Sequence, residues 1–414
     1  MYVHFLVIKK SEKCQDRKIE QNNLFNPILL INEKRKKGFM KKIVIQNARL
    51  VNGISKDILI ENGIIKKVSP SLDIDENTIV VALDDECYVS PGWIDIHTHC
   101  FHKFEIYADD CEAIGYKKGV TRVVDAGTAG ADNITEFYKS VENCKTHVYS
   151  LLNISKTGIY AQNELADMSH IDSQAFMEAY KKYPDFIVGV KARISKSVIG
   201  DNGDQPLLEA IKIANQVDLP LMIHIGTAPS SLQTVMSHMR KGDIVTHIFN
   251  PKSNGIVEHN GIKDCVLEAY QRGVYFDLGH GTDSFSFHSL DIANQHQIKV
   301  HSISSDIYHR NRENGPVFDL ATTMSKLYNR GYDLKDIIDC VTINPATMLR
   351  LKNLGKIEEG YCGELTIFKI IKEKKSLIDS LGVKIIVKEY IEPIAVVLNN
   401  EYINLKGVNS HECL

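Results

Sequence analysis

The chain has 414 residues, of which 43% are apolar and 24% are charged, as in an ordinary globular protein rather than a disordered one. This length allows one domain of roughly 250 residues with a smaller domain beside it. The net charge of −3 argues against nucleic acid as a partner, and no apolar run reaches the roughly 18 residues that cross a bilayer, so we expect no membrane contact either.

Residues 1–39 differ in composition from the rest of the chain. They hold nine Lys and Arg against four Asp and Glu, and they show no helix or strand periodicity. We predict a flexible N-terminal extension here. The alternatives are a start of translation at Met40 and a targeting arm.

Cysteine usage indicates a reducing compartment. The nine cysteines are an odd number, are scattered along the chain and form no Cys-x-x-Cys pair. Such a pattern is typical of reduced thiols rather than of a disulfide framework, and we expect a cytoplasmic protein.

Short runs rich in β-branched residues stand at both ends of the chain. The first set folds back at Asn62-Gly63 in the manner of a tight hairpin and predicts a small antiparallel sheet. These runs are Lys42–Gln46, Asp57–Val68, Thr78–Leu83, Glu364–Phe368, Lys384–Lys388 and Pro393–Leu398. We predict that residues 40–90 plus 355–414 build one small β-sandwich domain.

Between these ends, apolar strands alternate with amphipathic helices. The predicted strands are the run that ends at His99, Thr121–Asp125, Val148–Asn153, Ile187–Lys191, Leu221–His224, Ile244–His247, Val274–Asp277 and Lys299–Ser304. The predicted helices include Gln174–Tyr183, Leu207–Val217, Leu232–Lys241, Ile262–Arg272 and Val317–Asn329. Eight such units over residues 91–354 predict an α/β fold, a (β/α)₈ TIM barrel. A doubly wound open sheet would normally have a glycine-rich turn after its first strand, and this chain has none.

The first barrel strand ends in His97 and His99. Because successive side chains of a strand point to opposite faces, these two imidazoles project the same way. Parallel α/β folds place their chemistry at the carboxyl ends of strands. The same ends carry Lys191, His224, His247 and Asp306.

Imidazole nitrogen and carboxylate oxygen are ligands that divalent metal ions prefer, so the set predicts a metal site. Taken alone, His224 is as well explained by core packing and Asp306 by helix capping. Lys191 lies in an apolar strand, where burial frees a neutral amine that can take up carbon dioxide as a carbamate. A salt-bridged lysine is the alternative.

From residue 40 to about residue 410 the chain resembles the amidohydrolase superfamily of metal-dependent hydrolases, which has this ligand set in this order on a barrel. Further motifs resemble its dihydroorotase-like deacetylase branch, with Ser305 and Glu364 as small departures. These motifs are Val124–Ala131, Gly189–Arg193, Thr246–Asn250, Phe276–Gly281 and Ser304–Tyr308. The resemblance implies two Zn²⁺ per chain, the first held by His97, His99 and Asp306, the second by His224 and His247, with carboxylated Lys191 as the bridge.

The resemblance implies a deacetylase that cleaves the amide or ester acyl group of a small acetylated amino or hydroxy acid. A metal-bridging hydroxide would attack the acyl carbon, with Asp306 as the catalytic proton shuttle. We expect Arg193 and His280 to bind substrate, although Arg193 could form a structural ion pair and His280 could be a turn residue. We also expect a homo-oligomer. The alternatives are a cyclic amidase of the dihydroorotase or hydantoinase kind and a non-catalytic scaffold, against which the complete ligand set argues.

Overall fold

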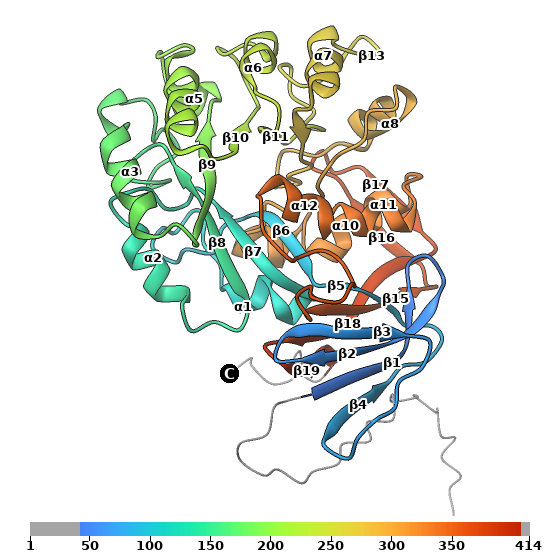
Figure 1. Ribbon diagram of the computed structural model, residues 1–414. Coiled ribbons are helices and arrows are strands. Elements are labelled where there is room, and N and C mark those ends of the chain that lie inside the picture. Colours follow the sequence, from blue (N-terminus) through green and yellow to red (C-terminus); the bar gives the residue numbers. More distant parts are fainter. Residues whose placement is uncertain (1–41, 407–414) are drawn as a thin grey trace, which may run out of the picture.

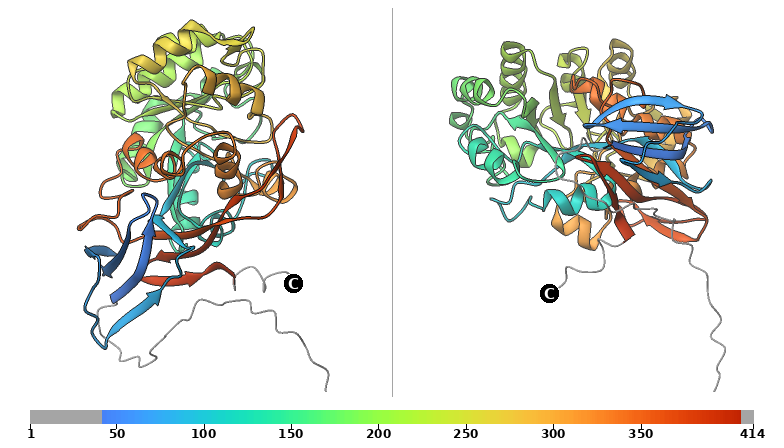
Figure 2. Two further views of the ribbon diagram at one scale, coloured as in Figure 1. Left: turned by 90° about the vertical axis from the view of Figure 1, so that its right-hand side faces the viewer. Right: turned by 60° about the horizontal axis from the view of Figure 1, so that its bottom comes forward.

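The computed structural model describes residues 42–406, which form a curled parallel sheet covered by helices and a second sheet below it (Figure 1). Strands from both ends of this range lie side by side in the second sheet, as two further views show (Figure 2). The predicted extension over residues 1–39 lies outside the described residues.

The parallel sheet has seven strands in the order β14-β11-β10-β9-β8-β7-β6, and each neighbouring pair is parallel. The strands are β6 Trp93–Thr98, β7 Val120–Ala126, β8 His147–Asn153, β9 Ile187–Arg193, β10 Leu221–His224, β11 Ile244–Thr246 and β14 Tyr275–Phe276. β6, β7 and β9 are buried along their whole length, as expected of strands packed on both faces. All carboxyl ends therefore meet at one rim.

Amphipathic segments form helices on the outer face of this sheet, and several of these helices begin at a residue whose side chain caps the first turn. Asp172 caps α3, Ser231 caps α6 and Asp319 caps α10, each through a side-chain oxygen. The helices, with η for 3₁₀ turns, are α1 Cys111–Ile114, η1 Tyr116–Lys118, α2 Ile134–Val141, η2 Met168–His170, α3 Ser173–Lys182, α4 Lys196–Ile199, α5 Gln205–Val217, α6 Leu232–His238, α7 Asp264–Arg272, α8 Phe287–Gln295, α9 His309–Asn314, α10 Leu320–Tyr328, α11 Leu334–Asp339 and α12 Ile343–Met348. The five helices named from the sequence are confirmed.

The predicted eighth strand, Lys299–Ser304, is wrong as a regular strand. Over these residues the segment does not pair with β6, because another part of the chain lies between them: Ile303 donates its N–H to the carbonyl of Cys340 (3.0 Å), and Ile94 of β6 donates to the carbonyl of Val341 (2.7 Å). Leu278 beyond β14 donates its N–H to the carbonyl of Ser302 (3.0 Å), whereas Asp306 donates to the carbonyl of His97 on β6 (2.7 Å). Residues 301–307 thus bridge the two edges at the rim.

The second sheet has eight strands in the order β19-β18-β15-β5-β1-β2-β3, with β4 also paired to β1. Its strands are β1 Lys42–Leu50, β2 Ser55–Glu61, β3 Ile64–Ser69, β4 Thr78–Ala82, β5 Tyr88–Pro91, β15 Leu365–Ile371, β18 Tyr390–Leu398 and β19 Glu401–Asn404. The expectation of an antiparallel sheet is wrong in part, because β1 runs parallel to both β4 and β5. The strands pair as one sheet. The β-sandwich domain predicted for residues 40–90 plus 355–414, with these boundaries, therefore stays a prediction.

The other described strands are outside both sheets. The predicted terminal strand at Lys384 is β17 Lys384–Val387, which pairs with β16 Lys375–Ile378 in a separate ribbon, and β12 Val257–Glu258 pairs with β13 Gly261–Ile262. The predicted hairpin between β2 and β3 is confirmed: Asn62 and Gly63 both have positive φ, as its turn requires. No helix in residues 42–406 is both long and apolar enough to cross a membrane, and the seven cysteines of this range are free.

A buried ion pair joins the two sheets. Arg122 of β7 donates through Nη2 to Glu364 Oε1 (2.8 Å), and His147 of β8 also lies 2.8 Å from that oxygen. Burial acts to raise the pKa of Glu364, but the hydrogen bond with His147 and the charge of Arg122 outweigh it and the pKa is lowered. Glu364 is thus ionised at the junction.

Glu364→Ala should destabilise the fold by about 3 kcal/mol, because it leaves the Arg122 guanidinium buried without its carboxylate. Unfolding in denaturant measures the change. Glu358→Ala is the control, since Glu358 pairs with Lys356 in solvent and should contribute less than about 0.5 kcal/mol. Equal stability of the two variants would contradict a structural role for the junction.

Candidate active site

The structure brings the first predicted ligand group together at the rim. His97 ends β6, His99 follows it, and Asp306 lies on the bridging segment, with one ligand atom from each residue within 4.8 Å of the others. Asp306 Oδ1 lies 3.0 Å from His99 Nε2 and 3.4 Å from His97 Nε2. Two imidazoles and a carboxylate at this spacing form a donor set for a divalent ion.

The second predicted pair, His224 and His247, adjoins this group. The two ring centroids are 4.5 Å apart, and the ring of His247 is 5.0 Å from that of His97. His224 ends β10 and His247 follows β11, so the carboxyl ends of β6, β10 and β11 supply the imidazoles, and β9, the neighbour of β10, supplies Lys191. The cluster agrees with the order of ligands expected from the sequence.

Each of these imidazoles uses one ring nitrogen in a hydrogen bond to the protein. The partners are Thr246 Oγ1 for His97 Nδ1 (2.9 Å), Thr128 Oγ1 for His99 Nδ1 (2.7 Å), the Gly279 carbonyl for His247 Nδ1 (2.6 Å) and Ser195 Oγ for His224 Nε2 (3.0 Å). Such a bond orients the ring. The nitrogens left for a metal ion are Nε2 of His97, His99 and His247, and Nδ1 of His224.

Behind His97 lies a buried carboxylate that the sequence analysis missed. Asp277 accepts hydrogen bonds from Thr246 (2.6 Å), Ser302 (2.6 Å) and Ser304 (2.7 Å), and Thr246 in turn bonds to His97. A carboxylate behind a metal-binding histidine is a common support for the ring. Asp277 is the last residue of the predicted strand Val274–Asp277, and this position at a strand end is the signal by which the sequence could have identified it.

Burial keeps three of these imidazoles neutral. It lowers the pKa of His97 and of His224 well below the usual value, with a further contribution from nearby positive groups, and it lowers the pKa of His247 to about 4. A neutral imidazole has a lone pair to offer, whereas an imidazolium has none. Burial works to raise the pKa of Asp306, but the hydrogen bond with His99 and the positive charges around it prevail, so the pKa is lowered and the group is a carboxylate.

Lys191 is completely buried on β9. Its Nζ lies 3.2 Å from His97 Nε2 and 3.2 Å from Met222 Sδ, and no carboxylate in residues 42–406 lies within ion-pair distance of it. Burial lowers the pKa of Lys191 to about 7, which makes a neutral amine accessible. Gly127 provides the room for this side chain, because a Cβ there would lie 2.7 Å from Lys191 Cγ.

Both residues predicted to bind substrate are engaged within the protein. Arg193 donates through Nε (2.7 Å) and Nη2 (2.6 Å) to the two carboxylate oxygens of Glu164, which is fully buried. His280 lies 2.8 Å from the Gly281 carbonyl through Nδ1 and 2.6 Å from Lys326 Nζ through Nε2. The alternative of a structural ion pair therefore describes Arg193, and substrate contact by either residue stays a prediction.

The backbone at the rim is held in a conformation that is costly for ordinary residues. His247 and Asp306 have φ of 65° and 51°, in the left-handed region. Such residues concentrate at functional sites, where the surrounding structure compensates for their strain. Gly281 approaches Asp306 so closely that a Cβ would lie 2.3 Å from Oδ2.

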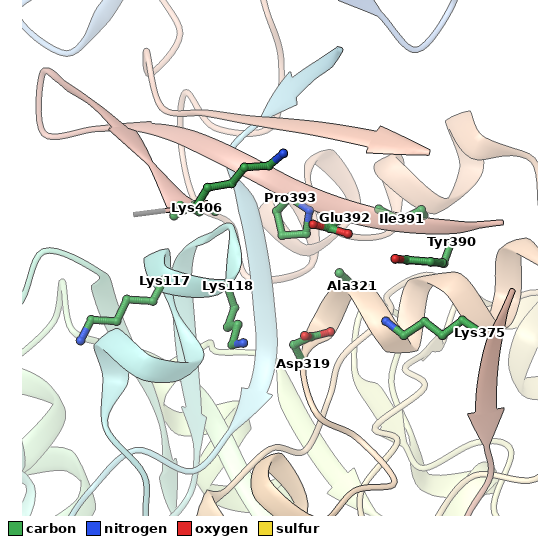
Figure 3. Close-up of a pocket in the computed structure, with 11 residues that line it drawn as sticks. Lys117, Lys118, Asp319, Ala321, Lys375, Tyr390, Ile391, Glu392, Pro393 and Lys406 are labelled. Atoms are coloured by element: carbon green, nitrogen blue, oxygen red, sulfur yellow. The ribbon is translucent and has the colours of Figure 1, made fainter. Parts of the chain in front are cut away.

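A hollow of about 230 Å³ lies elsewhere, between η1, the start of α10 and β18 (Figure 3). Lysines and acidic residues line it together: Lys117, Lys118, Asp319, Lys375, Glu392 and Lys406. None of the predicted site residues borders it. The chemistry of the chain is therefore assigned to the strand ends and not to this hollow.

Comparison with known proteins shows the family to which the chain is similar. Residues 88–400 match the model of the amidohydrolase family. The chain is 48% identical over 362 residues to a protein of Enterococcus faecalis named deacetylase, covering 87% of this chain and 98% of that protein. Among solved structures, one described as an adenine deaminase has a TM-score of 0.86 at 47% identity, covering 88% of this chain and all of that one. Another, described as a dihydroorotase, has a TM-score of 0.80 at 32% identity, covering 88% and 97%.

Gly281→Ala should lower turnover by about 100-fold, because the new methyl group displaces the Asp306 carboxylate. Gly203→Ala is the matched control: Gly203 has a similar φ of +59°, but nothing lies within 4 Å of its Cβ position. Both variants should lose about 1 kcal/mol of stability from backbone strain. Steady-state kinetics and denaturant unfolding measure the two effects, and equal turnover in both variants would contradict a placement role for Gly281.

Proposed function

The chain belongs to the amidohydrolase family and is a hydrolytic enzyme that acts on carbon–nitrogen bonds, and from this premise we propose that it is a deacetylase of small acetylated amino or hydroxy acids. The single observation that carries the choice of reaction is the 48% identity to a deacetylase over 98% of that protein's length. The neighbours described as an adenine deaminase and a dihydroorotase provide the rival reactions.

The donor set fits the metal ions that this family uses. His97, His99 and Asp306 would hold one divalent ion, and His224 with His247 a second, each ring through the nitrogen that its protein hydrogen bond leaves free. Zinc suits such mixed nitrogen and oxygen ligands. When bound, two such ions supply Lewis acidity and lower the pKa of a water molecule.

Lys191 fits the bridging position only as a carbamate. An ammonium group has no lone pair, but the neutral amine that burial favours can form a bond to the carbon of carbon dioxide and lose one proton. The resulting group offers two oxygens, so it can serve both ions. The absence of an ion-pair partner for Lys191 in the described part of the chain supports this modification.

Asp306 is the proton carrier of the proposed reaction. Its pKa is lowered, so at neutral pH it is a carboxylate that can accept a proton from the attacking water. It then gives this proton to the departing amine or alkoxide. The hydrogen bond with His99 and the close contact with Gly281 hold the carboxylate in place for both proton transfers.

A substrate screen tests the proposed reaction. The enzyme should release acetate from at least one N-acetylated amino acid or O-acetylated hydroxy acid faster than it converts dihydroorotate, hydantoin or adenine. Asp306→Asn should abolish the turnover of every substrate and serves to exclude a contaminating hydrolase. Faster opening of either ring, or faster release of ammonia from adenine, than any deacetylation would overturn the proposal.

Lys191→Ala should lose both turnover and bound metal, because the bridging oxygens disappear with the amine. A small added carboxylate such as propionate should restore part of both, since it can occupy the space that the side chain leaves. Lys191→Met is the matched control, because it fills this space and should resist rescue. Metal analysis beside kinetics measures the result; a Lys191→Ala variant with full metal and full turnover would contradict the bridge.

A further inference from the structure

We propose that Lys252, on the loop that follows His247, binds the carboxylate of the substrate. This inference rests on the proposed function for the class of substrate, an acylated acid. Its test is separate, because binding of the acid can be measured whether or not the acid is hydrolysed.

Charge is the first reason. Three cationic side chains act on the buried imidazoles of His224 and His247, namely Lys191, Arg193 and Lys252. Lys191 is assigned to the metal bridge, and Arg193 is bonded to the buried carboxylate of Glu164 through Nε and Nη2. The ammonium group of Lys252 makes no hydrogen bond or ion pair with residues 42–406. It is the cation of this group that remains for a ligand.

Position is the second reason. The Lys252 side chain and the His224 ring both border Gly226. A Cβ on Gly226 would lie 2.5 Å from Ser195 Oγ, 3.5 Å from His224 Nε2 and 3.7 Å from Lys252 Cδ. The carbon stem of Lys252 therefore lies near a predicted metal ligand, on the side of the ring that bonds to Ser195, with no side chain at residue 226.

The loop that carries Lys252 is fixed by hydrogen bonds. Buried Asn250 donates to the carbonyl of His247 (2.8 Å) and accepts from the N–H of Lys252 (3.1 Å). Gly255 donates to the carbonyl of Lys252 (2.8 Å), and Lys263 donates to the carbonyl of Gly255 (2.7 Å). The backbone of Lys252 is thus placed relative to His247, and its partly buried side chain alone needs to adjust to a ligand.

The chemistry of the substrate agrees with this placement. In an acetylated amino or hydroxy acid the carboxylate is on the carbon next to the leaving nitrogen or oxygen. A cation beside His224 can therefore contact the carboxylate while the acyl carbon lies among the metal ligands. Hydrogen bonds to charged groups are among the stronger ones in proteins.

The test compares Lys252→Met, Lys252→Arg and Lys156→Met in the full-length, metal-loaded enzyme. Lys156 is the matched control, a partly buried lysine on another loop at the strand ends, after β8. The probes are the best acetylated acid from the substrate screen and its uncharged carboxamide, or N-acetylalanine and its carboxamide if no acid is hydrolysed. KM and kcat are measured where there is turnover, and Kd by calorimetry in every case.

Lys252→Met should raise KM and Kd for the acid roughly 10- to 100-fold, with little change in kcat and none in the affinity for the carboxamide. Lys252→Arg should keep most of the affinity, and Lys156→Met all of it. The inference is overturned if wild-type enzyme binds acid and carboxamide equally, or if Lys252→Met weakens both alike. If the enzyme hydrolyses no acetylated acid but still binds the acid more tightly than the carboxamide, and Lys252→Met removes this difference, the proposed reaction is refuted and the role of Lys252 stands.

Discussion

Imidazoles packed side by side in a buried space are most stable without charge, and much of the structure serves this condition. Burial and neighbouring cations lower the pKa of His97, His224 and His247. A hydroxyl or carbonyl partner then occupies one nitrogen of each ring and orients that ring. The apolar parallel strands make this possible, because they bury the ring positions and end at a common rim.

The close approach of the rim segments constrains the backbone as well. Residues 301–305 bond to the residues at and after β14, residues 306 and 307 bond to His97 and His99, and Asp306 takes a left-handed conformation there. Glycines at 127 and 281 leave the space that Lys191 and Asp306 occupy. The contact between the sheet edges, the backbone strain and the placement of the Asp306 carboxylate are therefore aspects of one arrangement.

The strand-end residues could be predicted from the sequence because apolar runs and period-two alternation are local signals, and the ends of parallel strands must meet. The Asn62-Gly63 hairpin was predictable for the same reason. Long-range pairing was not: nothing in Lys384–Val387 indicates that it pairs with β16 instead of the terminal sheet, and the residues of β1 do not reveal parallel partners. The ion-pair partner of Arg193 was equally hidden, since Glu164 lies on a distant loop. That Lys252 has no partner in residues 42–406 could be recognised only once its surroundings were known.

Metal content tests the central claim most directly, because every role assigned to the rim depends on the imidazoles serving as ligands. Purified, fully active enzyme should contain two equivalents of divalent metal per chain, and a His247→Ala variant should retain no more than one. Elemental analysis against protein concentration gives both numbers. Full activity with one equivalent or less in the wild-type protein would contradict the assignment of His224 and His247 to a second ion.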